Sequence, residues 1–234
     1  MSSSTPPKTY SQPRFARPRG ATDLLLIRHG EAAVLGDEEP FPTIGGQGDP
    51  GLSNEGRRQA ELVAGRLAHE EIDVIYVSNL RRTAQTAAPL AEQLGLQPRV
   101  EADLREVYLG EWEGALFRKM VAEHHPAATR LWREERWDVI PGAEAGDLFS
   151  ARVRGVFDRI VTRHPDQRVA VFCHGAVIGQ ILAEVSEAKP FTFVHCDNGS
   201  ISQLVVARSR AYIRRFNDTA HLTPTFSLEA EPPT

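Results

Sequence analysis

The sequence is poor in cysteine, in methionine and in long apolar runs. Two cysteines and two methionines occur among 234 residues, so the chain lacks the disulfide framework that typifies small secreted domains. No apolar run approaches the roughly 20 residues that a transmembrane helix needs. The first residues also lack the apolar core of a secretory signal. We therefore expect a cytoplasmic protein without a membrane partner.

The chain also lacks an excess of positive charge. Its 27 Lys and Arg residues face 31 Asp and Glu residues, which leaves a formal net charge of −4. Proteins that bind nucleic acid through overall charge are basic, so we expect no nucleic-acid partner. An anionic ligand would have to be held by cations that cluster locally. The 41% apolar and 25% charged residues are ordinary for a globular domain.

Composition divides the chain into three parts. Residues 1–20 are rich in Ser, Pro and Arg and carry no acidic residue, which predicts a disordered N-terminal arm. Residues 223–234 contain three prolines and are expected to be irregular. The segment 21–222 between them is predicted to form a single domain.

Within that segment, short apolar strands alternate with amphipathic helices. This order predicts an α/β fold, a three-layer α/β/α sandwich with a mostly parallel central sheet. The expected strands are residues 24–28, 72–77, 169–173, 201–207 and 211–216. The expected helices are a segment capped by Ser53, then residues 80–94, 115–124, 127–137, 147–164 and 176–185. Pro89 should bend or split its helix. Ala33–Gly51 is a long polar loop that forms either a lid or specificity loop or a flexible surface segment.

Two expected strands end in a histidine that is followed by a glycine. Leu24–Ile27 leads into Arg28-His29-Gly30-Glu31, and the strand ending at Cys173 leads into His174-Gly175. Ligands of open α/β sheets bind beyond the carboxyl ends of the strands. A guanidinium group can hold an anion there, and a neutral imidazole can attack it. The two strand ends therefore predict one phosphate site.

Three further motifs lie between these strand ends. They are Gly51-Leu52-Ser53-Asn54-Glu55-Gly56-Arg57-Arg58-Gln59-Ala60, Ser78-Asn79-Leu80-Arg81-Arg82-Thr83-Ala84-Gln85-Thr86-Ala87, and Leu104-Arg105-Glu106 followed by Gly110-Glu111-Trp112-Glu113-Gly114. With these five motifs in order, residues 22–216 resemble the histidine phosphatase superfamily, which also contains the cofactor-dependent phosphoglycerate mutases. The resemblance implies a phosphoglycerate mutase-like fold and favours the phosphatase branch.

The resemblance also implies roles for individual residues. His29 would be the nucleophile that forms a phosphohistidine, His174 would donate a hydrogen bond to the phosphoryl group, and Glu106 would protonate the leaving group. The family's second arginine stands three residues before Gln-Thr-Ala, which selects Arg82; its neighbour Arg81 must face another direction on a helix. The implied catalytic residues are His29, Glu106, Arg28, Arg82 and His174, and the implied phosphate-binding residues are Arg28, Gly30, Arg82, His174 and Gly175.

These residues predict a phosphoric monoester hydrolase, similar to acid phosphatases, that uses neither metal nor cofactor. Two His-Cys pairs, Cys173-His174 and His195-Cys196, match no common zinc spacing. The expected ligand is a small phosphorylated metabolite whose identity the sequence leaves open. A homodimer is the commonest arrangement for a soluble oligomer.

Two other functions stay open. Mutases of the family carry Ser or Thr and, three places later, Asn after the first motif, whereas this chain has Ala32 and Leu35. A mutase is therefore the less favoured enzyme, and a non-catalytic module that binds a phosphorylated ligand is the alternative from another class. Pro141-Gly142-Ala143-Glu144 resembles a Pro-Gly-Gly-Glu-Ser stretch of family phosphatases. Its Glu144 lies either near the site or at a helix start, and Trp112 lies either in the pocket or in the core.

Overall fold

The computed structural model describes residues 11–34, 42–114, 116–208 and 210–222. Its centre is a six-stranded sheet with the strand order β5-β4-β6-β1-β7-β8. The strands of this sheet are β1 Thr22–Arg28, β4 Val74–Val77, β5 Arg99–Val100, β6 Arg168–Cys173, β7 Ile201–Ala207 and β8 Arg210–Asp218. Strands β5, β4, β6 and β1 are parallel, while β7 runs antiparallel to both β1 and β8. The mostly parallel sheet expected from the sequence is confirmed.

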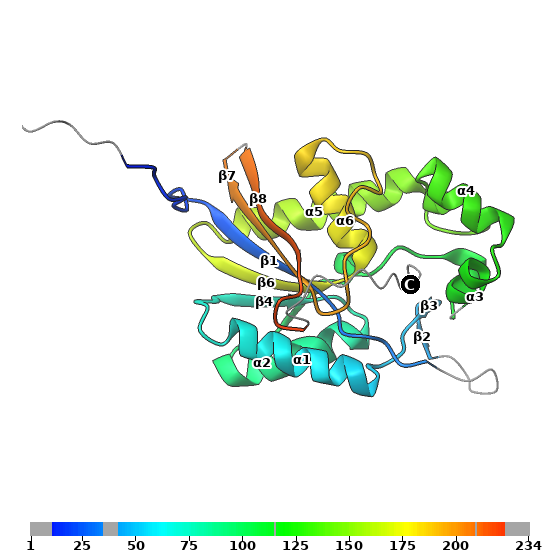
Figure 1. The fold of residues 1–234 in the computed structure, drawn as a ribbon, viewed down its shortest axis with the longest axis horizontal. Coiled ribbons are helices and arrows are strands. Elements are labelled where there is room, and N and C mark those ends of the chain that lie inside the picture. Colours follow the sequence, from blue (N-terminus) through cyan, green and yellow to red (C-terminus); the bar gives the residue numbers. More distant parts are fainter. Residues whose placement is uncertain (1–10, 35–41, 115, 209, 223–234) are drawn as a thin grey trace, which may run out of the picture.

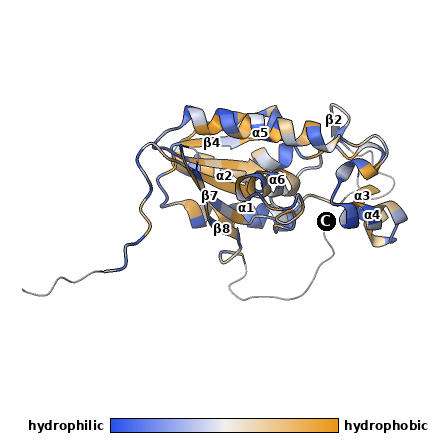
Figure 2. Ribbon diagram, turned by 90° about the horizontal axis from the view of Figure 1, so that it is seen from above, coloured by the Kyte–Doolittle hydropathy of each residue, from blue (hydrophilic) through white to orange (hydrophobic). Residues whose placement is uncertain are grey.

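The apolar strands separate two cores because their side chains alternate between the faces of the sheet. On β1, Leu25 and Ile27 pack against α1 (Asn54–Leu67) and α2 (Arg81–Leu94). Leu24 and Leu26 lie on the opposite face and pack with α5 (Gly146–Arg163) and α6 (Gly175–Ser186). Figure 1 shows these helix pairs on opposite sides of the sheet, which gives the predicted three layers. In Figure 2 the apolar colouring concentrates on the strands between the helices.

Two shorter helices lie beyond the sheet, on the side where β1 leads into the following loop (Figure 1). They are α3 (Leu116–Ala122) and α4 (Pro126–Glu134). Pro126 is the first residue of α4, where its missing N–H removes no helical hydrogen bond, so the expected start at residue 127 was one residue late. The segment 104–114, expected to be a loop, contains the end of the 3₁₀ turn Ala102–Leu104 and the whole of a second turn, Gly110–Trp112.

Local sequence signals correctly predicted the start of α1 and the end of α2. The Ser53 side chain accepts a hydrogen bond from the Gly56 N–H, as expected of an N-cap. Gly95 ends α2 in the left-handed conformation with φ of 66°. Pro89, however, does not split α2, which runs unbroken from residue 81 to residue 94.

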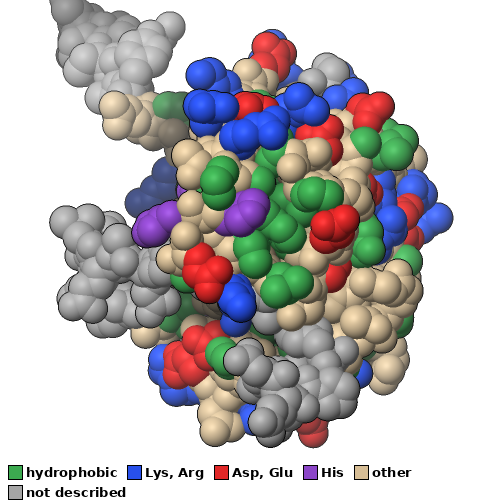
Figure 3. Space-filling model, turned by 90° about the vertical axis from the view of Figure 1, so that its right-hand side faces the viewer, with side chains coloured by type: hydrophobic (Ala, Val, Ile, Leu, Met, Phe, Trp, Pro, Cys, Tyr) green, Lys and Arg blue, Asp and Glu red, His purple; other side chains and the backbone are tan. Residues whose placement is uncertain are grey.

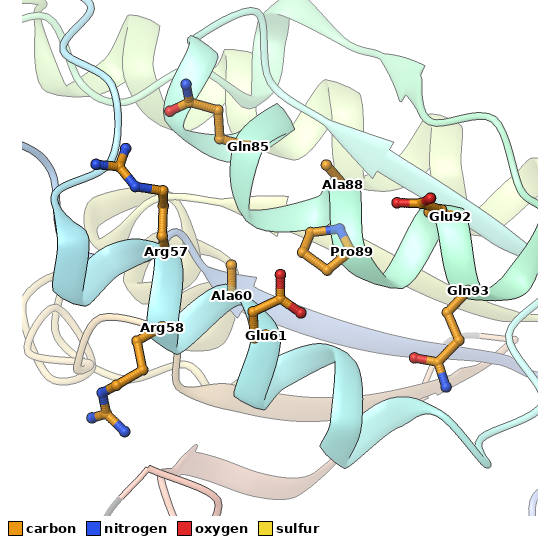
Figure 4. Close-up of a pocket in the computed structure, with 9 residues that line it drawn as sticks. All are labelled: Arg57, Arg58, Ala60, Glu61, Gln85, Ala88, Pro89, Glu92 and Gln93. Carbon is orange, nitrogen blue, oxygen red and sulfur yellow. The ribbon is translucent and has the colours of Figure 1, made fainter.

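Pro89 lies on the outer side of α2, beside a surface groove between α1 and α2. The groove holds about 710 Å³, and Figure 4 shows Pro89 and Gln85 facing it. The Pro89 ring removes the N–H that would bond the Gln85 carbonyl in an unbroken helix, and α2 is packed into the core by buried residues before and after the proline, among them Ala87 and Leu90. The groove is lined by Arg57, Arg58, Ala60, Glu61, Gln85, Ala88, Pro89, Glu92 and Gln93.

The long polar loop contains structure that the sequence did not indicate. Strands β2 (Thr43–Ile44) and β3 (Gln47–Gly48) form a two-stranded hairpin, while residues 35–41 of the loop lie outside the described residues. The arm expected over residues 1–20 is described only from residue 11, and the expected tail 223–234 lies outside the described residues. No described helix combines the length and the apolarity that crossing a membrane requires.

Candidate active site

His29 follows the last residue of β1, and its ring is fixed by two neighbours. Its Nδ1 lies 2.7 Å from the Gly30 carbonyl oxygen, and its Nε2 lies 3.1 Å from the Nε of Arg82. A carbonyl can only accept and a guanidinium can only donate a hydrogen bond. We therefore assign the proton to Nδ1, which leaves the lone pair on Nε2 directed into the site.

The backbone around His29 is held from three directions. The Gly30 N–H donates to Thr86 Oγ1 at 2.9 Å, and the Asn198 side chain donates to the His29 carbonyl at 2.9 Å. Gly30 also passes very close to α1, since a Cβ atom built on it would lie 2.5 Å from the Gly56 carbonyl oxygen. The structure thus places Gly30 where it orients the nucleophile candidate, with its N–H already bonded within the protein.

Arg82 lies in the first turn of α2 and reaches the centre of the site. Besides its bond to His29, its Nη1 donates to the Gly48 carbonyl at 3.1 Å. Burial lowers the pKa of Arg82 to about 10, so the guanidinium stays charged at neutral pH. Its neighbour Arg81 faces outward and forms an ion pair with Asp49 at 2.9 Å. The structure therefore brings Arg82, and not Arg81, to His29.

His174 approaches from the neighbouring strand, at the point where β6 meets α6. Its ring centroid lies 5.0 Å from that of His29. Its Nε2 is 2.9 Å from Ser78 Oγ, whereas its buried Nδ1 has no hydrogen-bond partner among the described residues. Burial lowers the pKa of His174 well below its usual value, and the charge of Arg82 lowers it further. The same two causes lower the pKa of His29, so both rings are neutral at neutral pH.

Glu106 brings a carboxyl group to the same place from the segment after the first 3₁₀ turn. Its Oε1 accepts from the Val107 N–H at 2.9 Å, and its Oε2 from the Ala176 N–H at 3.3 Å. Burial raises the pKa of Glu106 above its usual value, against the opposing effect of those N–H bonds and of Arg82. Such a carboxyl group can carry a proton at higher pH than an exposed one.

Arg28 completes the positive side of the site. Its Nη1 donates to the Cys196 carbonyl at 2.5 Å. A Cβ atom on Gly175 would lie 3.6 Å from the Arg28 Nε, so the start of α6 packs against this guanidinium. Two guanidinium groups beside two neutral imidazoles offer donors and positive charge to a ligand, which suits a phosphate dianion.

Trp112 and Glu144, whose location the sequence left open, lie outside this cluster. Trp112 is buried and packs edge-on against His125, with ring centroids 5.4 Å apart, so it belongs to the core. Glu144 pairs with Arg152 at 2.7 Å and does not begin α5, which starts at Gly146.

The face of α3 and α4 in Figure 3 carries apolar side chains across its middle and a group of Lys and Arg side chains along its upper rim.

The sequence left the role of the polar loop open and did not single out the residues at its end that contact the site. Gln47 Nε2 donates to the Glu106 carbonyl at 2.8 Å, and the Gly48 N–H donates to Glu113 Oε2 at 2.7 Å. The Gly48 carbonyl also accepts from Arg82, and Asp49 pairs with Arg81. Gln47, Gly48 and Asp49 therefore connect the start of α2 to the segment around Glu106. Asp49 is also buried, but no periodicity marked the segment.

A comparison with family models decides the classification. Residues 24–219 match the model of the histidine phosphatase superfamily, branch 1. The chain belongs to this family. Its membership confirms the resemblance, which rested on five short motifs.

Similar proteins agree with this assignment to the histidine phosphatase superfamily. The chain is 35% identical over 203 residues to phosphoserine phosphatase 1 of Hydrogenobacter thermophilus, covering 85% of this chain and 93% of that protein. The solved structure of a mycobacterial glucosyl-3-phosphoglycerate phosphatase matches with a TM-score of 0.70 and 29% identity, covering 85% of this chain and 100% of the other. The expected phosphoric monoester hydrolase of this superfamily is thereby confirmed.

The fold likeness extends to a mutase. A phosphoglycerate mutase from Bacillus anthracis str. Sterne matches with a TM-score of 0.73 at 22% identity, covering 87% of this chain and 96% of the other. At this identity the likeness shows the phosphoglycerate mutase-like fold alone.

Proposed function

We propose that this histidine phosphatase hydrolyses small phosphate monoesters through a phosphohistidine formed on His29, without a metal ion. Arg28, Arg82 and His174 hold the phosphoryl group, and Glu106 transfers the protons. The observation that carries the proposal is the His29 ring. Its Nδ1 is bonded to the Gly30 carbonyl, its Nε2 faces a guanidinium, and its depressed pKa keeps it neutral.

In the first step, the Nε2 lone pair of His29 attacks phosphorus and the ester P–O bond breaks. The hydrogen bond from Arg82 Nε to His29 Nε2 is long, at 3.1 Å. The charged guanidinium can exchange this bond for stronger ones to phosphoryl oxygens. The leaving oxygen takes the proton of the Glu106 carboxyl group. The raised pKa of Glu106 favours this role because the acid form persists to higher pH.

The buried Nδ1 of His174 supports a role for this ring in binding the phosphoryl group. Ser78 Oγ accepts from the Leu80 N–H at 3.1 Å and also lies 3.0 Å from Thr83 Oγ1. In the proposed arrangement, Ser78 donates its own proton to His174 Nε2. That arrangement puts a proton on Nδ1, and a phosphoryl oxygen would accept it. An N–H already aimed at the phosphoryl group stabilises the charge that spreads over its oxygens in the transition state.

In the second step, water attacks the phosphohistidine. Glu106, now a carboxylate, accepts a proton from this water, the N–P bond breaks, and inorganic phosphate leaves. This second step restores both His29 and Glu106 to their starting forms. The covalent intermediate divides one difficult displacement into two easier ones.

Release of inorganic phosphate from an aryl phosphate tests this proposal, with a chelator present throughout. We expect the wild-type protein to turn over and His29→Ala to lose this turnover, because the other imidazole at the site, that of His174, has its Nε2 bonded to Ser78 Oγ and, in this proposal, a proton on Nδ1. Arg159→Lys, on the outer part of α5, is the control that should retain activity. Turnover that persists in His29→Ala, or that the chelator abolishes, would contradict the proposal.

The same assay separates the alternatives. A mutase would transfer the phosphoryl group to a sugar-acid hydroxyl and would require a bisphosphate primer. A binding module would bind inorganic phosphate and release none from any substrate.

A further inference from the structure

Arg152, on α5, is a buried arginine that binds the backbone of the segment leading into Glu106 and of Glu106 itself. Its Nη1 donates to the Asp103 carbonyl at 2.7 Å and to the Arg105 carbonyl at 2.9 Å. Its Nη2 reaches the Glu106 carbonyl at 3.4 Å. One guanidinium group therefore binds three carbonyl oxygens within the four residues that end at Glu106.

Glu144 fixes this guanidinium from the other side. The two side chains are 11% and 8% exposed. They form a bidentate pair, with distances of 2.8 Å from Arg152 Nε to Oε1 and 2.7 Å from Nη2 to Oε2. Glu144 Oε2 also accepts from the Tyr108 N–H at 3.3 Å. The pair thus contacts the chain before and after Glu106, and its planar geometry limits how far that segment can move.

Neither member of the pair is placed to touch a phosphoryl group. Glu144 is occupied by Arg152 and by a backbone N–H, and the described bonds of Arg152 all go to Glu144 or to carbonyl oxygens. Burying a charged pair costs desolvation energy that the pair's own attraction does not always offset. A buried pair with this bond pattern fits a role in geometry better than a role in binding an anion.

We propose that Arg152 is a positioning residue that, held by Glu144, fixes the Glu106 carboxyl group at the phosphate site. This inference rests on the proposed function, in which Glu106 protonates the leaving group. Without the guanidinium fork, the segment 103–108 would shift and the carboxyl group would move away from the leaving oxygen. The phosphate-binding residues would keep their own contacts.

A comparison of two leaving groups tests this inference. An alkyl phosphate needs a proton on its leaving oxygen, whereas the oxygen of an activated aryl phosphate leaves as a stable anion and depends on the acid much less. The measurement is kcat/KM for both substrates, because it reports the step in which the ester bond breaks. The variants are Arg152→Lys and Glu144→Gln, which keep most of the buried volume, and Glu106→Gln as the reference.

We expect Arg152→Lys and Glu144→Gln to lower kcat/KM for the alkyl phosphate at least ~10-fold more than for the aryl phosphate, since small misplacements of a catalytic group cost up to ~100-fold. Glu106→Gln should show the same selectivity, and adding Arg152→Lys to it should cost little more. Inhibition by inorganic phosphate should stay unchanged. The matched control is Arg159→Lys, on the same helix, whose partners are the side chains of Glu101 and Asp103; it should affect both substrates equally and weakly.

Two outcomes would overturn the inference, and they differ in what they mean for the proposed function. If Glu106→Gln is selective but Arg152→Lys lowers both substrates equally or neither, the positioning role is wrong and the proposed function stands. If Glu106→Gln itself shows no selectivity, Glu106 is not the acid and the inference is overturned with it, while loss of turnover in His29→Ala would still support the phosphohistidine.

Discussion

Replacing Gly30 by alanine should slow catalysis through the position of His29. The Gly30 carbonyl receives the His29 Nδ1 proton at 2.7 Å, and this residue passes so close to α1 that a Cβ atom would lie 2.5 Å from the Gly56 carbonyl oxygen. Real Cβ atoms do not approach a neighbour within 3.0 Å. Both partners are backbone, so neither can rotate away.

The size of the effect follows from this distance. The backbones at residues 30 and 56 must separate by at least about 0.5 Å, and by about 0.9 Å for an ordinary contact. Strain of this kind costs about 1–3 kcal/mol of the free energy of unfolding. A displacement approaching 1 Å at a catalytic group costs up to ~100-fold in rate. We therefore expect Gly30→Ala to lower kcat/KM roughly 10- to 100-fold.

The assay combines phosphate release with urea unfolding, and Gly65→Ala is the control. Gly65 lies inside α1, where an added Cβ atom would meet nothing within 4 Å. This change should raise the free energy of unfolding by about 0.5–1 kcal/mol and leave kcat/KM unchanged. If Gly30→Ala kept both the stability and the kcat/KM of the wild-type protein, the argument from the close approach to α1 would be refuted.

Three further predictions concern charge and protonation. Arg82→Lys should lower kcat/KM about 100- to 1,000-fold in the phosphate-release assay, because lysine cannot replace the fork that reaches both His29 and Gly48; a loss below about threefold would contradict this role. The kcat/KM of the wild-type protein for an alkyl phosphate should fall as pH rises through the raised pKa of Glu106, since only the acid form donates, and this fall should be absent from the pH profile of Glu106→Gln. The pKa of His29 is lower in the folded protein than in the unfolded chain, so the unfolded chain binds a proton that the folded protein does not. The free energy of unfolding should therefore decrease as pH falls below ~6.5. Urea unfolding should show a smaller decrease in His29→Gln, and an equal decrease would count against the depressed pKa.

The positions of the two histidines could be predicted from the sequence for a physical reason. Each follows a run of apolar residues that must be buried, and parallel strands deliver their carboxyl ends to one edge of the sheet. The choice of Arg82 over Arg81 came from the register of the family motif. The structure shows why it matters, since Arg82 is buried at the site, whereas Arg81 is exposed and pairs with the buried Asp49.

The residues that hold the site together could not be predicted in this way. Gln47, Gly48 and Asp49 lie in a Gly- and Pro-rich segment without periodicity, and their roles depend on contacts with residues far along the chain. Arg152 is charged and lies on an amphipathic helix, where a charged residue is usually solvated. Its burial depends on Glu144 and on three carbonyl oxygens that only the folded chain brings together.

The central claim is a covalent phosphohistidine on His29, and trapping it tests that claim most directly. The wild-type protein would be mixed with an aryl phosphate, quenched within the first turnovers, and digested under alkaline conditions for mass spectrometry. We predict one phosphoryl group on the peptide that contains His29, and none in His29→Ala. A protein that turns over the substrate while this peptide stays unmodified, or that carries the phosphoryl group on another residue, would contradict the account.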